Sequence, residues 1–204
     1  MLRLLSILGL GALLAACGTS RVSETVIDRP VEQPSAVRVV YVAGRPNVRV
    51  TEGVDIPVPG KDWLSQLGFY EVGGRVTKLA PSMLEKYGVK ADAMVLRAAD
   101  FAARGYAAAL KDYNGVERLS LVTMEFKRGS MTSYGGLTAR LELEAQFRDA
   151  STGKVYWKAQ YSTLAKKNVL VSKTFGDDEF VQDMLQQIFD DLEKAALLPR
   201  KMKP

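Results

Sequence analysis

The stretch Leu137-Thr-Ala-Arg-Leu-Glu-Leu-Glu-Ala-Gln-Phe147 alternates apolar and polar residues without interruption. Its odd-numbered positions are leucine, alanine or phenylalanine, and its even-numbered positions are polar or charged. Successive side chains of a β-strand point to opposite faces of the sheet. The pattern therefore predicts a strand with one buried face and one solvated face.

The residues that follow predict the partner strand. Asp149-Ala-Ser-Thr-Gly153 is a turn sequence, because the aspartate can accept backbone N–H groups and the glycine can adopt a positive φ. Apolar residues then alternate again from Val155 to Tyr161. We expect a hairpin over 137–163. The register that keeps its apolar faces together pairs Phe147 with Val155, Ala145 with Trp157, Leu143 with Ala159 and Glu144 with Lys158.

Further elements are expected on both sides of this hairpin. A helix over 177–196 follows from helical spacing of Val181, Met184, Leu185, Ile188 and Leu192. Its acidic residues Asp183, Asp190, Asp191 and Glu193 are expected on a solvated face. Gly73-Gly74 is expected to form the turn of a small hairpin over 69–77. The remaining expected elements are strands at 36–42, 47–51, 117–127 and 168–174, and short helices at 61–67 and 81–87, the second opened by Pro81 and ended by Gly88.

The alanine-rich segment between Asp92 and Tyr113 allows two interpretations. Its small and apolar residues recur at roughly helical spacing, which favours one long helix that Asp92 caps. The alternative is a strand over 93–97 followed by a helix that starts near Asp100. We prefer the single helix. With the other elements it predicts an α+β fold: one domain over 36–204, with a mainly antiparallel sheet and helices packed on one face.

The first seventeen residues predict export from the cytoplasm. Arg3 is followed by an apolar run from Leu4 to Ala16, which has the length of a signal-peptide core rather than of a membrane-spanning helix. The run ends at Leu14-Ala-Ala-Cys17, which resembles the lipobox of bacterial lipoproteins. That resemblance implies a signal peptide over 1–16 and a lipidated Cys17 as the new N-terminus. Two or more acyl chains hold a protein stably on a membrane.

The residues after the cysteine predict the location and the reach of the domain. Position 18 is glycine and not the aspartate that retains such lipoproteins in the inner membrane, so the resemblance implies the periplasmic face of the outer membrane, with inner-membrane retention as the alternative. The polar segment over 17–35 contains Pro30 and Pro34, and we expect a flexible tether there.

Composition excludes most catalytic chemistries. The 204 residues contain no histidine and one cysteine, so hydrolytic triads with histidine and zinc sites with histidine or cysteine ligands are not available. No phosphate-binding glycine motif is present outside the leader. We expect no catalytic residue, no metal and no cofactor. The formal net charge of +5 is spread along the chain without a basic arm, so no nucleic-acid partner is expected.

A glycine- and serine-rich segment between two expected strands is the candidate contact site. Residues 128–136 contain Met131 and Tyr134, two residue types that are common at interfaces. We expect these two residues to contact an envelope protein or a lipid-linked partner, with a loop that has no task as the alternative.

The hairpin itself resembles a family of small envelope proteins. The Arg-x-Glu-x-Glu strand and Asp149-Ala-Ser-Thr-Gly-Lys-Val-Tyr-Trp157 are similar to a hairpin of periplasmic lipoproteins that include relatives of the curli-secretion lipoprotein and activators of penicillin-binding proteins. The resemblance implies a fold like the N-terminal domain of the Tol-system propeller protein. It favours a non-enzymatic accessory lipoprotein of an envelope assembly or transport complex. The alternative is an oligomeric structural or pore-forming secretion lipoprotein. The oligomeric state does not follow from the sequence.

Overall fold

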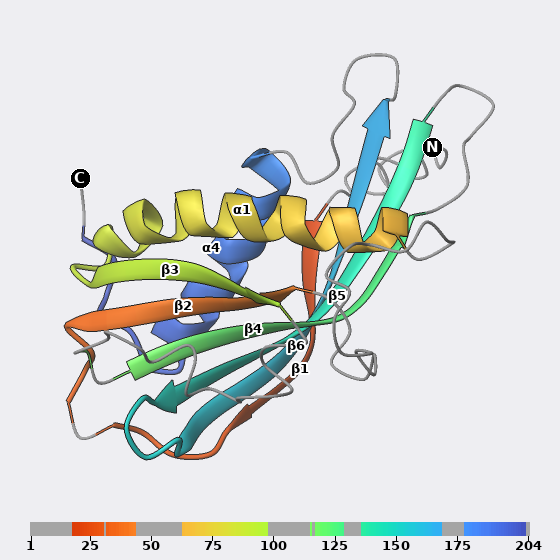
Figure 1. Ribbon diagram of the computed structural model, residues 1–204. Helices are drawn as coiled ribbons and strands as arrows, with labels where there is room; N and C mark the ends of the chain where they lie inside the picture. Colours follow the sequence, from red (N-terminus) through yellow and green to blue (C-terminus); the bar gives the residue numbers. More distant parts are fainter. Residues whose placement is uncertain are drawn as a thin grey trace, which may run out of the picture.

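Six strands form one mixed sheet with the order β1-β6-β5-β4-β2-β3 (Figure 1). The computed structural model describes residues 18–30, 32–43, 63–97, 115, 117–128, 136–168 and 178–202. The pairs β1–β6, β6–β5 and β5–β4 are antiparallel, whereas β2 is parallel to both β3 and β4. Together with the two helices among these described residues, the sheet makes the expected α+β domain. The strands are β1 (Gly18–Val26), β2 (Ala36–Ala43), β3 (Lys90–Arg97), β4 (Glu117–Arg128), β5 (Gly136–Asp149) and β6 (Val155–Asn168).

The central hairpin is confirmed, with a register two residues away from the expected one. Phe147 pairs with Trp157, and Ala145 pairs with Ala159. A shift of two residues leaves every side chain on its expected face, so hydrophobic alternation alone cannot distinguish the two registers. The turn decides between them, because the Asp149 N–H donates to the Lys154 carbonyl at 2.9 Å and a bulge follows Phe147.

The helix α1 (Trp63–Glu85) replaces three expected elements. The short helix at 61–67, the hairpin at 69–77 and the helix at 81–87 were expected as separate elements, and the glycine turn at 73–74 is wrong. Apolar residues at helical spacing face the sheet along this helix, and their burial outweighs the weak helix propensity of three glycines and Pro81. These buried residues are Val72, Val76, Ala80, Met83 and Leu84.

Glycine at position 73 lets α1 approach the sheet closely. A Cβ atom there would lie 2.9 Å from Cδ1 of Tyr41 and 3.0 Å from Cγ2 of Val95. Gly74, the next residue, would meet nothing within 4 Å. Gly88 ends the helix, as expected: it has a φ of 72°, and the Val89 N–H donates to the Leu84 carbonyl at 3.3 Å.

The segment after α1 is a strand and not the start of a long helix. Residues 90–97 form β3, which is parallel to β2, so the expected helix from Asp92 is wrong over these residues and the alternative strand is confirmed. Tertiary pairing outweighs helix propensity here, since β2 offers an unpaired edge and Leu96 joins a small apolar cluster with Val40 and Val42. Residues 98–114 lie outside the described residues.

The first strand occupies part of the expected tether. Residues 18–26 form β1, an edge strand antiparallel to β6, so a flexible tether over 17–35 is wrong for these residues. Their inward positions carry Thr19, Arg21 and Glu24 rather than apolar side chains, and hydrophobic alternation therefore gives no sign of the strand. The strands expected at 47–51 and over most of 168–174 lie outside the described residues.

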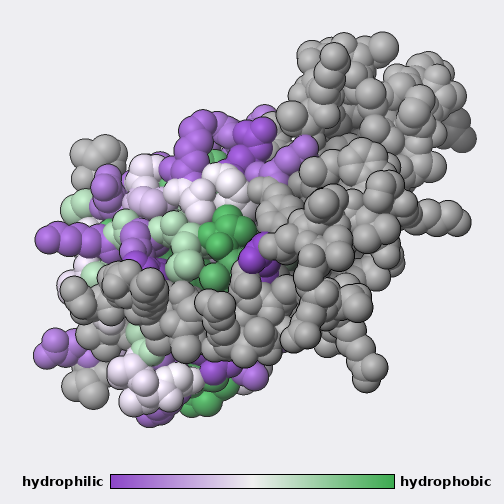
Figure 2. Space-filling view, viewed as in Figure 1, coloured by the Kyte–Doolittle hydropathy of each residue, from purple (hydrophilic) through white to green (hydrophobic). Residues whose placement is uncertain are grey.

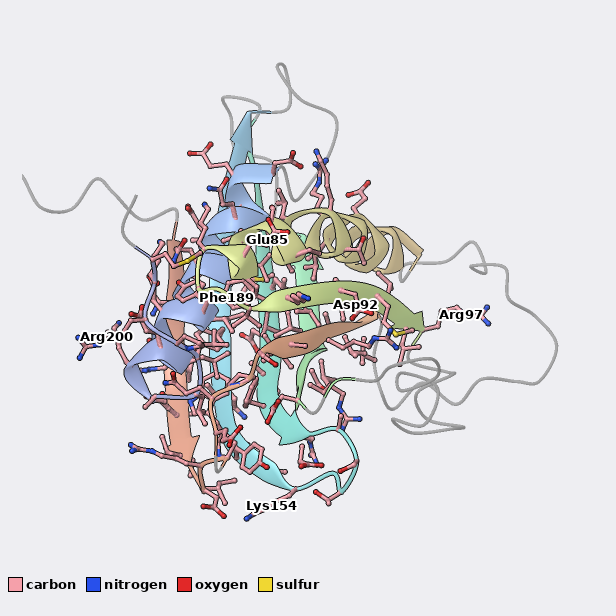
Figure 3. The ribbon with its side chains drawn as sticks, turned by 90° about the vertical axis from the view of Figure 1, so that its left-hand side faces the viewer. Glu85, Asp92, Arg97, Lys154, Phe189 and Arg200 are labelled. Atoms are coloured by element: carbon pink, nitrogen blue, oxygen red, sulfur yellow. The ribbon has the colours of Figure 1, made fainter. Side chains whose placement is uncertain are left out.

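The main hydrophobic core lies between the sheet and the two helices. The helix α4 (Asp178–Lys194) buries the five expected apolar residues together with Phe189, which points from α4 toward the body of the domain (Figure 3). Leu197 and Leu198, beyond the end of α4, complete the core with 0% and 1% exposure. On the opposite face of the sheet, hydrophobic residues show over β2 and β3 (Figure 2).

Candidate functional site

The chain enters the sheet one residue after Cys17. Gly18 is the first residue of β1 and pairs with Leu164 of β6. Cys17 itself lies outside the described residues, but the covalent chain keeps its Cα about 3.8 Å from that of Gly18. Any group attached to Cys17 is therefore joined to the edge strand of the sheet without a spacer.

A network of polar side chains fixes β1 to the rest of the domain. We name Arg21, Glu24, Trp157, Tyr161 and Asp191 the β1 clamp. Arg21 of β1 lies 3.1 Å from Oδ1 of Asp191 on α4 and 2.5 Å from Oε2 of Glu24. The Trp157 indole donates to Oε1 of Glu24 at 2.8 Å, and the Tyr161 hydroxyl donates to Oδ2 of Asp191 at 2.9 Å. The clamp therefore joins β1 to both β6 and α4.

Asp191 is the centre of the clamp. Its side chain is 1% exposed, and it accepts a further hydrogen bond from Gln187 at 3.1 Å. A buried carboxylate is stable only when it is paired and hydrogen-bonded, and Asp191 has both kinds of partner. Burial, with Asp191 beside it, raises the pKa of the Tyr161 hydroxyl, so this group stays a neutral donor. The expected solvated position of Asp191 is thus wrong.

The strands β4, β5 and β6 end near Gly18. β5 and β6 have 14 residues each, whereas β1 has 9, and the first described residue of β1 already pairs with Leu164. In this register Lys127 pairs with Arg140 and Arg140 with Leu164, while Thr138 pairs with Lys166. Arg140 is exposed. Basic residues thus share the sheet end at which the chain leaves Cys17.

At the other end of the hairpin, two carboxyl groups differ in acidity. Glu117 pairs with Asp149 in the sheet; burial, with Asp149 nearby, raises the pKa of Glu117 to about 7. Hydrogen bonds from Ser151 and Thr152 lower the pKa of Asp149 to about 2. The Asp149 carboxylate accepts the backbone N–H groups of Ser151 at 2.8 Å and Thr152 at 2.7 Å, as the turn sequence predicts. These bonds hold the turn between β5 and β6.

The expected partner-contact residues Met131 and Tyr134 lie outside the described residues, between β4 and β5. The clamp residues Arg21 and Glu24 were missed because a polar segment with prolines predicts a tether. The hydrogen bond between Tyr161 and Asp191 joins residues of different elements, and the sequence alone does not show that they meet.

Among the residues that the structure describes, neither helix has the length and apolar character of a membrane-spanning segment. Within the same part of the chain, no three side chains of the histidine, cysteine, aspartate or glutamate type form a metal-binding group.

Bacterial envelope proteins are among the structural neighbours. A PelC dodecamer from Paraburkholderia phytofirmans is 16% identical, with 88% of this chain and 99% of that one covered and a TM-score of 0.44. The lipoprotein GNA1162 from Neisseria meningitidis is 14% identical, with 79% and 99% covered and a TM-score of 0.42. A minor lipoprotein from Acinetobacter baumannii is 13% identical, with 83% and 97% covered and a TM-score of 0.34. No family model and no curated protein matches the chain.

Proposed function

We propose that this protein is a lipoprotein anchored through Cys17 on the periplasmic face of the outer membrane, where it acts as a non-enzymatic accessory component of an envelope assembly or transport complex. The observation that carries the proposal is the start of β1 at Gly18, directly after the lipobox cysteine. An acyl anchor at this place holds the folded domain against the bilayer. A protein of this kind acts by placing a binding surface at a fixed height above the membrane.

The β1 clamp gives this arrangement its stiffness. Without the Arg21–Asp191 ion pair, the polar contacts of β1 would be those to β6, which are its backbone hydrogen bonds and side-chain bonds such as Trp157 to Glu24. With them, a pull on Cys17 is transmitted to α4 and the core. The fixed geometry suits a partner that must meet the domain in one orientation.

Mass spectrometry of the protein from membranes tests the anchor. We expect a mature N-terminus at Cys17 with a diacylglyceryl group and an amide-linked acyl chain, and loss of both in Cys17→Ser. The Cys17→Ser protein is expected to retain residues 1–16. A wild-type protein with a free thiol at Cys17 contradicts the proposal.

Crosslinking in intact cells tests the accessory role. A photoreactive residue at Tyr134, in the segment between β4 and β5, is expected to capture a defined envelope protein. The same residue at exposed Lys154, at the far turn of the hairpin, is the control and is expected not to capture it. Equal capture from both positions contradicts a specific contact at Tyr134.

An oligomeric lipoprotein is the second candidate. Among the described strands, β1 and β3 each pair with one neighbour and lie at opposite edges of the sheet. Pairing of one edge with the other edge of a second copy is a heterologous contact, and such contacts close into rings when the rotation permits. Native mass spectrometry in detergent distinguishes the candidates, since a monomer excludes the ring.

A further inference from the structure

Basic residues gather at one end of the sheet. They are Lys127 and Arg128 at the end of β4, Arg140 near the start of β5, and Lys166 and Lys167 at the end of β6, and we name them the basic strand ends. Residues 127–140 and 164–168 contain these five basic residues and no acidic one. From Cys17 onward, the remainder of the chain has 22 basic and 23 acidic residues, so the positive excess of the mature chain comes from the strand ends.

The register brings these residues together across three adjacent strands. Lys127 pairs with Arg140, and the next residue on β4, Arg128, pairs with Ala139. On the other side of β5, Lys166 and Lys167 pair with Thr138 and Leu137. Adjacent strands lie about 4.8 Å apart and residues about 3.4 Å apart along a strand, so the backbone positions of these five residues fall within a narrow area. The register places Lys127, Arg140 and Lys166 on one face of the sheet and Arg128 and Lys167 on the other. The nearest acidic residues in the same register, Glu125 and Glu142, lie two positions farther from the strand ends.

The same end of the sheet is the one next to Cys17. Gly18 pairs with Leu164, which is two residues before Lys166 and pairs with Arg140. In Figure 1 the ends of β5 and β6 rise at the upper right, away from the C-terminus at the left. A membrane that holds acyl chains on Cys17 therefore meets this end of the domain first.

We infer that the basic strand ends bind anionic phospholipid headgroups, so that the domain docks on the bilayer through a second, electrostatic contact beside the acyl anchor. This inference rests on the proposed anchor for its membrane. Each basic side chain near an anionic surface strengthens binding several-fold, and the attraction falls off within a Debye length of about 10 Å at 0.1 M salt. A cation cluster that a short covalent link keeps at the surface stays inside that range.

Vesicle binding without the acyl chains tests the inference separately from the anchor. The protein is the chain from residue 17 with Cys17→Ser, which contains every described element; circular dichroism checks its fold. We expect it to cosediment with vesicles of 70% phosphatidylcholine and 30% phosphatidylglycerol at 50 mM salt, to be released at 500 mM salt, and not to bind phosphatidylcholine alone. Failure of this binding overturns the inference even when mass spectrometry finds lipidated Cys17.

A pair of charge-matched variants locates the contact. The triple variant Lys127→Gln/Lys166→Gln/Lys167→Gln is expected to bind the anionic vesicles about a hundredfold more weakly. The control variant Lys86→Gln/Lys90→Gln/Arg200→Gln removes three exposed charges at the other end of the molecule, where Arg200 points away from the domain (Figure 3), and is expected to keep binding within about threefold. An equal loss in both variants overturns the inference.

Two further measurements complete the test. If the triple variant does not fold, the exposed Arg140→Gln alone is expected to weaken vesicle binding about fivefold, and an unchanged affinity overturns the inference. A soluble anionic polysaccharide serves as a competitor of another chemical class. Tight binding to this polymer with no binding to phosphatidylglycerol vesicles overturns the inference in favour of a polysaccharide partner.

Discussion

Gly73 and Gly74 are adjacent in sequence and differ in what surrounds them. Gly73→Ala places a methyl group 2.9 Å from the buried ring of Tyr41, whereas Gly74→Ala meets nothing within 4 Å. We expect Gly73→Ala to lower the free energy of unfolding by about 1 kcal/mol, because overpacking outweighs the gain in helix propensity. Gly74→Ala is the matched control and is expected to raise it by about 0.5–1 kcal/mol. Urea denaturation measures both, and equal effects would contradict the close approach of α1 to β2.

The raised pKa of Glu117 makes stability depend on pH. Its pKa is about 7 in the folded protein against a reference value of 4.5, so the folded state binds more protons between these values. The free energy of unfolding therefore falls as the pH rises from about 4.5 to 7, by about 2–3 kcal/mol. Glu117→Gln is expected to remove this pH dependence between about pH 4.5 and 7, as measured by urea denaturation. The change of exposed Glu179 on α4, Glu179→Gln, is the control.

Asp149 acts in the opposite direction at lower pH. Its pKa of about 2 lies below the reference value of 3.8, so its contribution to stability is present above pH 4 and is lost as the pH falls toward 2. Together the two residues predict greatest stability at about pH 4 to 5. A stability curve that rises steadily from pH 5 to pH 8 in the wild-type protein would contradict the assignment to Glu117.

At the scale of elements, the β1 clamp decides whether the first strand stays on the sheet. Asp191→Ala leaves the Tyr161 hydroxyl without its acceptor and Arg21 without its buried partner, so we expect a loss of about 2–4 kcal/mol in the free energy of unfolding. Hydrogen exchange is expected to accelerate in residues 18–26 before it does in β5. Asp183→Ala, an exposed change on the same helix, is expected to stay within about 0.5 kcal/mol of the parent.

Hydrophobic alternation predicted the elements whose buried faces are apolar. The hairpin of β5 and β6, β2, β4 and α4 were all expected, because each repeats apolar residues at its own period. β1 was not expected, since Arg21 and Glu24 occupy its inward positions and find partners that only the fold supplies. The glycines of α1 led to a prediction of three separate elements, and the alanines of β3 led to a prediction of a helix. At both places the local conformational propensity differs from the structure that tertiary packing stabilises. The lipobox and the basic residues were visible in the sequence, but their proximity depends on the register of β1 against β6.

At the scale of the whole molecule, the start of β1 at Gly18 would set the distance between the domain and the membrane in the anchored form that we propose. Ten glycine and serine residues inserted between Cys17 and Gly18 would add a root-mean-square reach of about 17 Å. We expect the insertion to lower energy transfer from a dye on Thr138→Cys to acceptor-labelled lipid headgroups. The same insertion between Thr152 and Gly153, in the far turn, is the control and is expected to leave the transfer unchanged. Equal transfer in all three proteins would contradict direct docking.

The contacts between the N-terminal and C-terminal segments have a consequence for how the chain completes its fold. Arg21 bonds to Asp191, and the Gln33 side chain donates to the Leu198 carbonyl at 3.3 Å, so the N-terminal strand reaches its final place only when the last residues are present. Leu197 and Leu198, in the same C-terminal segment, are almost fully buried in the core. If the chain is exported as we propose, a polypeptide that is still threading through a translocation pore lacks residues 191–198 and stays extended, which is the state that such a pore accepts. Under that proposal the fold closes only after this segment has crossed the membrane.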